Sequence, residues 1–307
     1  MMSVKRHIAV CFLCIILLGC GGEWENTPVG KTSCSFGSFN DFIPAGRKPA
    51  KMASGNNGNN LYILDDSYYS VHTYERDNVY ECAFNFKDSY PFNGFLSDVI
   101  FSGGNFYVQD KAQLKSWKDI KICDARDGIF SIHGDELAVG SNMGIEIWNI
   151  NPCTKKENIS SQKVLALAAT GNGYYAAEGI ATEPQNLVMF SKNGSVYREP
   201  MSSTPGNEKN FCSADRVVAN DYGVYLLDKK CKKIGIFDNQ AVWRKTVSLD
   251  AIGIRDVLDI ATGEYSYIFI LHERGVERLR FALLSITSCS EPFLGFLQRN
   301  SAFPEGK

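Results

Sequence analysis

The chain has 307 residues, of which 44% are hydrophobic and 21% charged, and its formal net charge is -2. This is the composition of an ordinary globular protein with a sizeable core, and the length permits one large domain or two small ones. Basic residues are scattered and do not outnumber acidic ones, which argues against a broad nucleic-acid-binding face. We therefore expect no nucleic-acid partner.

Residues 1–19 have the pattern of an export signal. Lys5 and Arg6 give a basic start, and the apolar run 8–18 (IAVCFLCIILL) is too short to span a bilayer. The run ends in Leu-Leu-Gly before Cys20, which resembles the lipobox of bacterial lipoproteins. The resemblance implies cleavage before Cys20, acylation of Cys20 and anchoring to the cell envelope, with the glycines at 21–22 favouring the outer membrane. The alternative is a plain signal peptide in which Cys20 has no role.

A repeated pattern of apolar runs begins near residue 50. Each copy has three mostly apolar residues followed by a small or polar residue, and the last members of successive copies are 45, 31, 37, 50 and 44 residues apart. The six copies occupy residues 62–65, 107–110, 138–141, 175–178, 225–228 and 269–272.

Further apolar runs precede and follow most copies, and a more polar run closes most units. Four strands in about 40 residues are typical of a β-propeller blade. A lone four-stranded sheet has two apolar faces, and radial packing against neighbouring sheets covers both. We predict an all-β fold, a six-bladed β-propeller with four antiparallel strands per blade. A seven-bladed propeller and a two-sheet sandwich are the alternatives.

Three segments carry a resemblance to known propeller repeats. Residues 223–228 (GVYLLD) with 233–238 (KIGIFD), and residues 60–65 (NLYILD), resemble NHL-type and related YVTN-type repeats. Residues 144–150 (GIEIWNI) resemble the LVIVD-type variant. The resemblance covers residues 50–289 and implies an architecture, without implying an activity.

The ends of the domain and the cysteines complete the predicted organisation. We predict a lipid-anchored tether over 20–32, the propeller over 33–297 and a tail over 298–307. A strand at 33–39 is expected to pair with the last blade, and a Cys34–Cys289 disulfide would staple that seam. Cys212 and Cys231 flank a predicted hairpin, so we expect them to form a second disulfide. The alternative is that the cysteines are small buried hydrophobes.

Candidate ligand-binding residues are those at the ends of the repeated runs and at the starts of the inner strands. In a propeller these positions surround one mouth of the central funnel. The predicted funnel-mouth set is Asp65, Asp98, Asp110, Glu178, Asp228, Asp256, His272, Arg126 and Arg255. Such an acidic mouth with a few arginines suits a cation, with calcium the candidate ion, or a polar ligand. The alternative is that each aspartate bonds its own backbone to begin a turn.

Motifs for common catalytic sites are absent from the sequence. It contains no G-x-S-x-G elbow, no H-E-x-x-H zinc motif and no P-loop. We therefore expect no cofactor and no catalytic residue, and we interpret the chain as an envelope scaffold that binds a protein or a polysaccharide. The aromatic loop 88–96 (DSYPFNGFL) and the loop 201–210 are candidate contact sites. The alternative is a metal-dependent hydrolase of the lactonase or glycan-active type, with its site in the funnel.

Overall fold

A computed structural model describes residues 30–36, 48–55, 58–65, 69–76, 82–159, 162–202, 204, 206–263 and 267–281. This part of the chain is built from β-strands and contains no α-helix. It therefore contains no helix that is long and apolar enough to cross a membrane. Cys20, the predicted export signal and the predicted tail lie outside the described residues.

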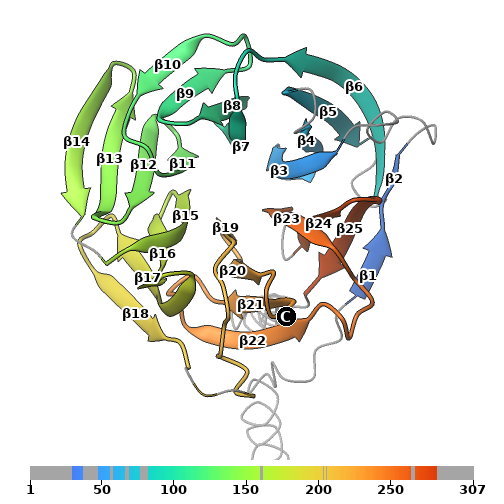
Figure 1. Ribbon diagram of the computed structural model, residues 1–307, viewed down its shortest axis with the longest axis vertical. Coiled ribbons are helices and arrows are strands. Elements are labelled where there is room, and N and C mark those ends of the chain that lie inside the picture. Colours follow the sequence, from blue (N-terminus) through green and yellow to red (C-terminus); the bar gives the residue numbers. More distant parts are fainter. Residues whose placement is uncertain are drawn as a thin grey trace, which may run out of the picture. The chain divides into compact units, whose positions relative to one another are not determined.

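The strands form six sheets arranged around a central axis (Figure 1). Blade 1 contains β3 (Pro49–Gly55), β4 (Asn60–Asp65), β5 (Ser70–Arg76) and β6 (Ala83–Pro91), and blade 2 contains β7 (Leu96–Ser102), β8 (Asn105–Asp110), β9 (Gln113–Ser116) and β10 (Lys121–Asp124). Blade 3 contains β11 (Ile129–His133), β12 (Glu136–Ser141), β13 (Gly144–Ile150) and β14 (Cys153–Ile159), and blade 4 contains β15 (Val164–Thr170), β16 (Gly173–Ile180), β17 (Glu183–Ser191) and β18 (Val196–Pro200). Blade 5 contains β19 (Arg216–Asn220), β20 (Gly223–Asp228), β21 (Lys233–Phe237) and β22 (Trp243–Ser248), and blade 6 contains β23 (Val257–Thr262), β24 (Tyr267–His272), β25 (Gly275–Arg280) and β1 (Gly30–Ser33).

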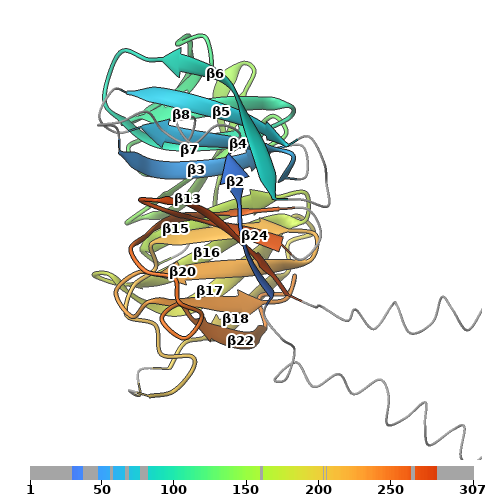
Figure 2. The same cartoon turned by 90° about the vertical axis from the view of Figure 1, so that its right-hand side faces the viewer.

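Each blade is an antiparallel meander whose first strand lies nearest the axis, and side by side the blades form a disc (Figure 2). The six repeated runs are the second strands β4, β8, β12, β16, β20 and β24. The predicted six-bladed β-propeller is therefore confirmed, and the seven-bladed and sandwich alternatives are wrong.

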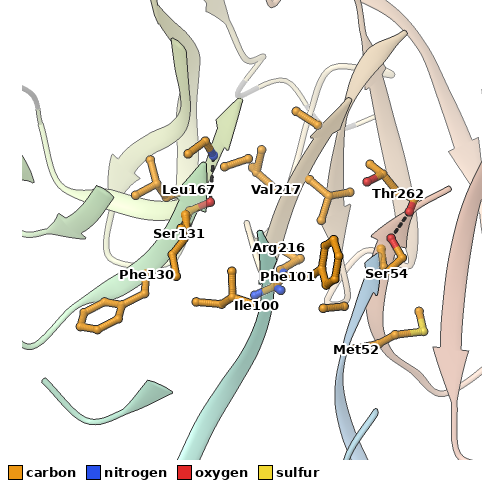
Figure 3. A pocket seen from close by; sticks show the side chains of 17 residues that line it. Met52, Ser54, Ile100, Phe101, Phe130, Ser131, Leu167, Arg216, Val217 and Thr262 are labelled. Atoms are coloured by element: carbon orange, nitrogen blue, oxygen red, sulfur yellow. Dashed lines mark hydrogen bonds between the residues drawn. The ribbon is translucent and has the colours of Figure 1, made fainter. Parts of the chain in front are cut away.

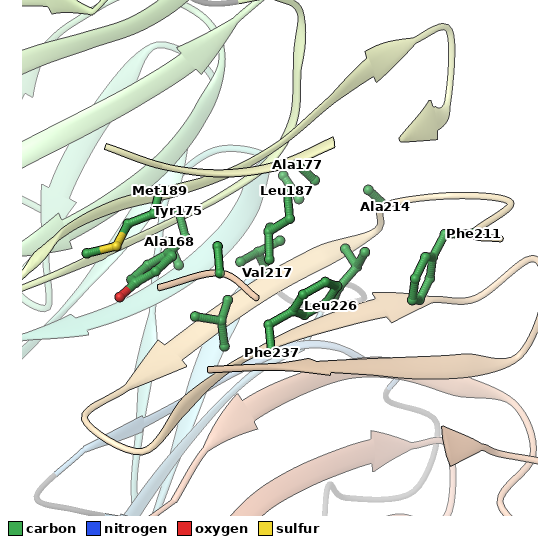
Figure 4. Packing of buried hydrophobic residues seen from close by; sticks show 13 residues of the cluster. Ala168, Tyr175, Ala177, Leu187, Met189, Phe211, Ala214, Val217, Leu226 and Phe237 are labelled. Carbon is green, nitrogen blue, oxygen red and sulfur yellow. The ribbon is translucent and has the colours of Figure 1, made fainter. Parts of the chain in front are cut away.

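Apolar side chains from neighbouring blades pack against each other between the sheets. Between blades 4 and 5, Tyr175 and Leu187 meet Leu226, Phe237 and Phe211 in one buried cluster (Figure 4). The residues of β16 and β20 are almost all buried, because neighbouring blades cover both faces of each sheet. This radial packing holds the inner strands in place, and the inner strands in turn position the channel residues described below.

The N-terminal segment closes the ring in a way that differs from the prediction. β1 (Gly30–Ser33) pairs antiparallel with β25 and completes blade 6. The closing strand therefore lies upstream of the predicted 33–39, and residues 30–32, assigned to the tether, belong to the propeller. The chain then reaches blade 1, where β2 (Ser35–Phe36) pairs parallel with β6.

The disulfides follow from this path of the chain. Cys34 lies between β1 and β2 and is bonded to Cys82, so the predicted Cys34–Cys289 pairing is wrong. The physical reason is that the segment after β1 runs beside blade 1, where the Ser35 N–H donates to the Cys82 carbonyl at 2.7 Å. The predicted Cys212–Cys231 disulfide is present in blade 5. A third disulfide joins Cys123 of blade 2 to Cys153 of blade 3.

Candidate functional site

The central channel has two mouths, and the inner strands run from one to the other. Because the second strand of each blade is antiparallel to the inner strand, second-strand ends and inner-strand starts lie at the same mouth. We name this the upper mouth, and the opposite end the lower mouth. A pocket of 450 Å³ lies at the upper mouth and one of 650 Å³ at the lower mouth. A narrower pocket of 110 Å³ shares lining residues with both (Figure 3).

Three of the predicted mouth carboxylates are buried within their own blades. Asp65 lies 3.4 Å from the Nε2 atom of His72, and Glu178 lies 3.2 Å from the Arg198 guanidinium. Asp228 accepts hydrogen bonds from the backbone N–H groups of Cys212 and Cys231 at 2.7 and 2.8 Å. Asp228 therefore stabilises its own turn, which is the alternative considered for these residues, whereas Asp65 and Glu178 pair with side chains on strands of their own blades. None of the three lines the upper-mouth pocket.

The predicted residues of blades 2 and 3 are also engaged locally. Asp110 forms an ion pair with Lys115 of the same blade, with 2.8 Å between Asp110 Oδ2 and Lys115 Nζ. Arg126 is exposed, and its guanidinium lies 3.6 Å from Glu146. Neither group faces the upper-mouth pocket. Only Asp98, among the nine predicted residues, lines that pocket.

The predicted residues of blade 6 form a separate small site. Arg255, Asp256 and His272 line a pocket of 310 Å³ beside Glu277. His272 accepts a hydrogen bond at Nδ1 from the backbone N–H of Arg274 at 3.2 Å. Burial lowers the pKa of His272, so this imidazole is neutral at pH 7. The sequence analysis placed these three residues in the funnel-mouth set, whereas in the structure they line a pocket apart from the upper-mouth pocket.

We searched the described part of the chain for places where histidine, cysteine, aspartate and glutamate side chains converge on one point. The one cluster of potential metal ligands found there is Cys212, Asp228 and Cys231. Its two cysteines are joined in a disulfide, and Asp228 is already bonded to their backbone N–H groups. Calcium requires six to eight oxygen ligands, which this set does not provide.

One residue from each blade occupies an equivalent register position at the upper mouth. In every blade this residue lies on the first strand. It pairs with the second-strand residue that immediately precedes the last residue of the repeated run. We name this set the mouth ring, and it consists of Lys51, Asp98, Ile129, Ala166, Arg216 and Asp259. All but Asp259 line the upper-mouth pocket. The ring is therefore a feature of the repeat, filled by different side chains in different blades.

A β-bulge precedes the ring residue in four blades. The register shifts just before Lys51, Asp98, Ala166 and Asp259. A bulge adds one residue to a strand and changes the direction of the side chain that follows it. Three of these four residues, Lys51, Asp98 and Asp259, are charged, whereas Arg216 pairs with Leu227 without a register shift.

Three of the four charged members of the ring, Arg216, Asp98 and Asp259, form a buried ionic cluster. Arg216 on blade 5 forms an ion pair with Asp98 on blade 2, and its Nε lies 3.6 Å from Asp259 on blade 6. Blades 5 and 2 are three positions apart in a ring of six, so the Arg216 side chain bridges the channel. Arg216 also lines the narrow channel pocket together with Ile100 and Phe101 (Figure 3).

Burial and charge act in opposite directions on the Arg216 guanidinium. Burial lowers its pKa, but Asp98 and Asp259 more than compensate and hold the pKa above its ordinary value. The side chains of Arg216, Asp98 and Asp259 are 14%, 9% and 0% exposed. The two carboxylates also accept backbone hydrogen bonds, from Val99 at 2.8 Å and Met52 at 2.9 Å. The cluster is therefore fixed in place at the channel.

Sequence reasoning missed Arg216, Asp259 and Lys51. Asp259 did carry a signal, because an aspartate inside the apolar run 257–261 (VLDIA) is unusual for a buried strand. Arg216 and Lys51 gave none, because their place at the mouth depends on strand register. Residue spacing alone does not reveal a bulge.

The aromatic loop is shorter than predicted. β6 extends to Pro91 and β7 begins at Leu96, so much of the predicted loop 88–96 is strand. Tyr90 and Phe92 pack against Phe106 of blade 2. Of the three aromatic residues in this loop, only Phe95 is strongly exposed, with 69% of its surface accessible, and it lines the upper-mouth pocket.

Comparison with known proteins supports the fold. No protein-family model matches the chain, and no curated protein matches it in sequence. Solved propeller structures do match. A Bacteroides thetaiotaomicron protein of unknown function has a TM-score of 0.57 and 10% identity, over 83% of this chain and 76% of that one.

Two enzymes match to a similar degree. Virginiamycin B lyase from Staphylococcus aureus, in an inactive form with quinupristin, has a TM-score of 0.54 and 9% identity, over 82% of this chain and 99% of that one. Hydrazine synthase from Kuenenia stuttgartiensis has a TM-score of 0.53 and 12% identity, over 76% and 84% of the two chains. Likeness at these identities establishes the propeller architecture and transfers no activity.

Proposed function

We propose that this chain is a lipid-anchored envelope protein whose propeller binds a protein or polysaccharide partner at the upper mouth. The observation that carries the proposal is the position of Phe95, a 69% exposed aromatic side chain at the edge of a 450 Å³ pocket. Exposed aromatic side chains beside a pocket suit both protein anchors and the faces of sugar rings. The rigid ring of blades supplies the fixed platform that such a contact requires.

The hydrolase alternative receives less support from the arrangement of the acidic groups. A metal-dependent site needs several oxygen ligands directed at one point, whereas Asp65, Glu178 and Asp228 are each bonded within a single blade. We accordingly propose that calcium is not a resident ion. Its addition is then expected to leave the melting temperature unchanged, since only a ligand of the folded form raises it.

Site-specific photocrosslinking in living cells tests the binding proposal. Phe95 is replaced by p-benzoylphenylalanine, and the matched control carries the same group at Tyr222, which is 47% exposed in the turn between β19 and β20 at the lower mouth. The proposal predicts an adduct, peptide or glycan by mass spectrometry, at position 95 and none at 222. Absence of an adduct at 95, or equal adducts at both positions, contradicts it.

Lipid anchoring has its own test. The chain is expressed in cells that are fed an alkyne-labelled fatty acid, and the wild type is compared with Cys20→Ala. We expect label on the wild-type protein alone, together with loss of the variant from the membrane fraction. Equal labelling of the two proteins would show that Cys20 is not the anchor.

A further inference from the structure

We infer that the upper mouth binds a small amphipathic anion, a carboxylate or phosphate group joined to an apolar body. The inference rests on the proposed function only for the choice of this mouth as the binding face. Its basis is an asymmetry of the mouth ring. Going around the channel, the blades 5, 6, 1 and 2 contribute Arg216, Asp259, Lys51 and Asp98, whereas blades 3 and 4 contribute Ile129 and Ala166.

The charged half of the mouth has cations without partners. Lys51 and Lys229 form no ion pair with any described residue, although both are only partly exposed. Lys229 follows the end of β20 at the upper mouth, within electrostatic reach of Lys51 and Arg216. Burial lowers the pKa of Lys229 and repulsion from Lys51 lowers it further, while Asp259 and Asp215 offset part of this effect. An anion placed between the two ammonium groups would relieve that repulsion.

The nearby carboxylates are already bonded. Asp98 and Asp259 share the Arg216 guanidinium. Asp215 accepts hydrogen bonds from the Ser213 hydroxyl at 2.5 Å and from the Lys229 backbone N–H at 2.8 Å. Asp127 is exposed at the rim, where water and salt screen its charge. Arg216 Nε and Asp259 Oδ1 lack a hydrogen bond but lie 3.6 Å from each other as an ion pair. The two ammonium groups form no ion pair with a described residue, and this favours an anion over a cation.

The opposite half of the mouth is apolar. Leu165, Leu167 and Ile129 line the same pocket, and Phe95 and Leu96 extend this surface to the rim. A pocket of 450 Å³ has room for a ligand of several carbon atoms. Apolar surface beside unpaired ammonium groups matches a ligand with a charged end and a hydrocarbon body.

Three simple probes test the inference by titration calorimetry on the full-length protein. Hexanoate carries both a carboxylate and an apolar chain, inorganic phosphate carries the charge alone, and 1-hexanol carries the chain alone. We expect saturable binding of hexanoate, at least tenfold tighter than binding of phosphate or hexanol, at constant ionic strength set with chloride. Lys51→Gln and Lys229→Gln are each expected to weaken hexanoate binding about tenfold.

Lys230→Gln is the matched control, because Lys230 is the exposed neighbour of the partly buried Lys229. It should leave hexanoate binding unchanged. No saturable binding of hexanoate, or equal losses in all three variants, overturns the inference. Hexanoate binding without a photocrosslink at position 95 would overturn the proposed partner and leave the inference standing. A crosslink at position 95 without hexanoate binding would overturn the inference and leave the proposed partner standing.

Discussion

Replacement of Arg216 by methionine should strongly destabilise the propeller. The substitution keeps much of the side-chain volume but removes the cation between Asp98 and Asp259, which are 9% and 0% exposed. Breaking a buried ion pair by removing one partner costs about 3 to 5 kcal/mol, because the remaining charge stays buried without compensation. For a domain of this size that loss lowers the melting temperature by roughly 6 to 20 °C.

Thermal unfolding followed by circular dichroism measures this effect. Arg126→Met is the control, because Arg126 is an exposed arginine whose ion pair with Glu146 spans 3.6 Å, and such pairs contribute about 1 kcal/mol or less. Adding Asp98→Asn and Asp259→Asn to Arg216→Met removes the unpaired charges and should restore most of the stability. The reasoning is refuted if Arg216→Met melts within 2 °C of the wild type, or if the triple variant is no more stable than the single one.

Three further predictions concern stability. Cys82→Ser opens a loop of 48 residues and should lower the free energy of unfolding by about 4 kcal/mol. Cys231→Ser opens a loop of 19 residues and should lower it by about 3 kcal/mol. Urea unfolding of the two variants checks this order, and the opposite order would contradict the loop argument. The hydrogen bond from Lys156 lowers the pKa of Glu136 from 4.5 to about 2, so its contribution is complete above pH 4.5 and is lost as the pH falls toward 2. The difference in melting temperature between wild type and Glu136→Gln should shrink over that interval, and a constant difference would contradict this. Gly173→Ala should lower the free energy of unfolding by about 2 to 4 kcal/mol, because φ is +150° and the added Cβ would lie 2.1 Å from the carbonyl oxygen of Phe190 on the next strand. Urea unfolding measures this loss, and an unchanged midpoint would disprove the prediction.

The blade architecture could be predicted from the sequence because it depends on local pattern. Runs such as 225–228, with turn residues on either side, recur in every blade, and radial packing gives each of them the same environment. The closing strand was harder to place. Gly30–Ser33 (GKTS) lies at the outer edge of blade 6 and has no alternation of apolar and polar residues. Its pairing is set by the position of β25, about 245 residues further along the chain, since Ser33 pairs with Glu277.

Of the nine predicted funnel-mouth residues, only Asp98 lines the upper-mouth pocket. An aspartate at the end of a strand can bond its own turn or face the channel, and the sequence does not distinguish the two. Asp228 does the former and Asp98 lines the channel pocket. Arg216 acquires its role from a carboxylate on the opposite blade, 118 residues away. Contacts across a channel depend on the closed ring as a whole, so residue spacing within a single repeat does not reveal them.

Hydroxyl-radical footprinting of the protein in its native envelope tests the central claim most directly. Phe95 at the upper mouth and Tyr222 at the lower mouth are both well exposed in the free protein, at 69% and 47%. If the upper mouth is the binding face, oxidation of Phe95 should fall several-fold in the envelope relative to the purified protein, while oxidation of Tyr222 stays the same. Equal oxidation of Phe95 in both settings, or protection of Tyr222 alone, would contradict the account.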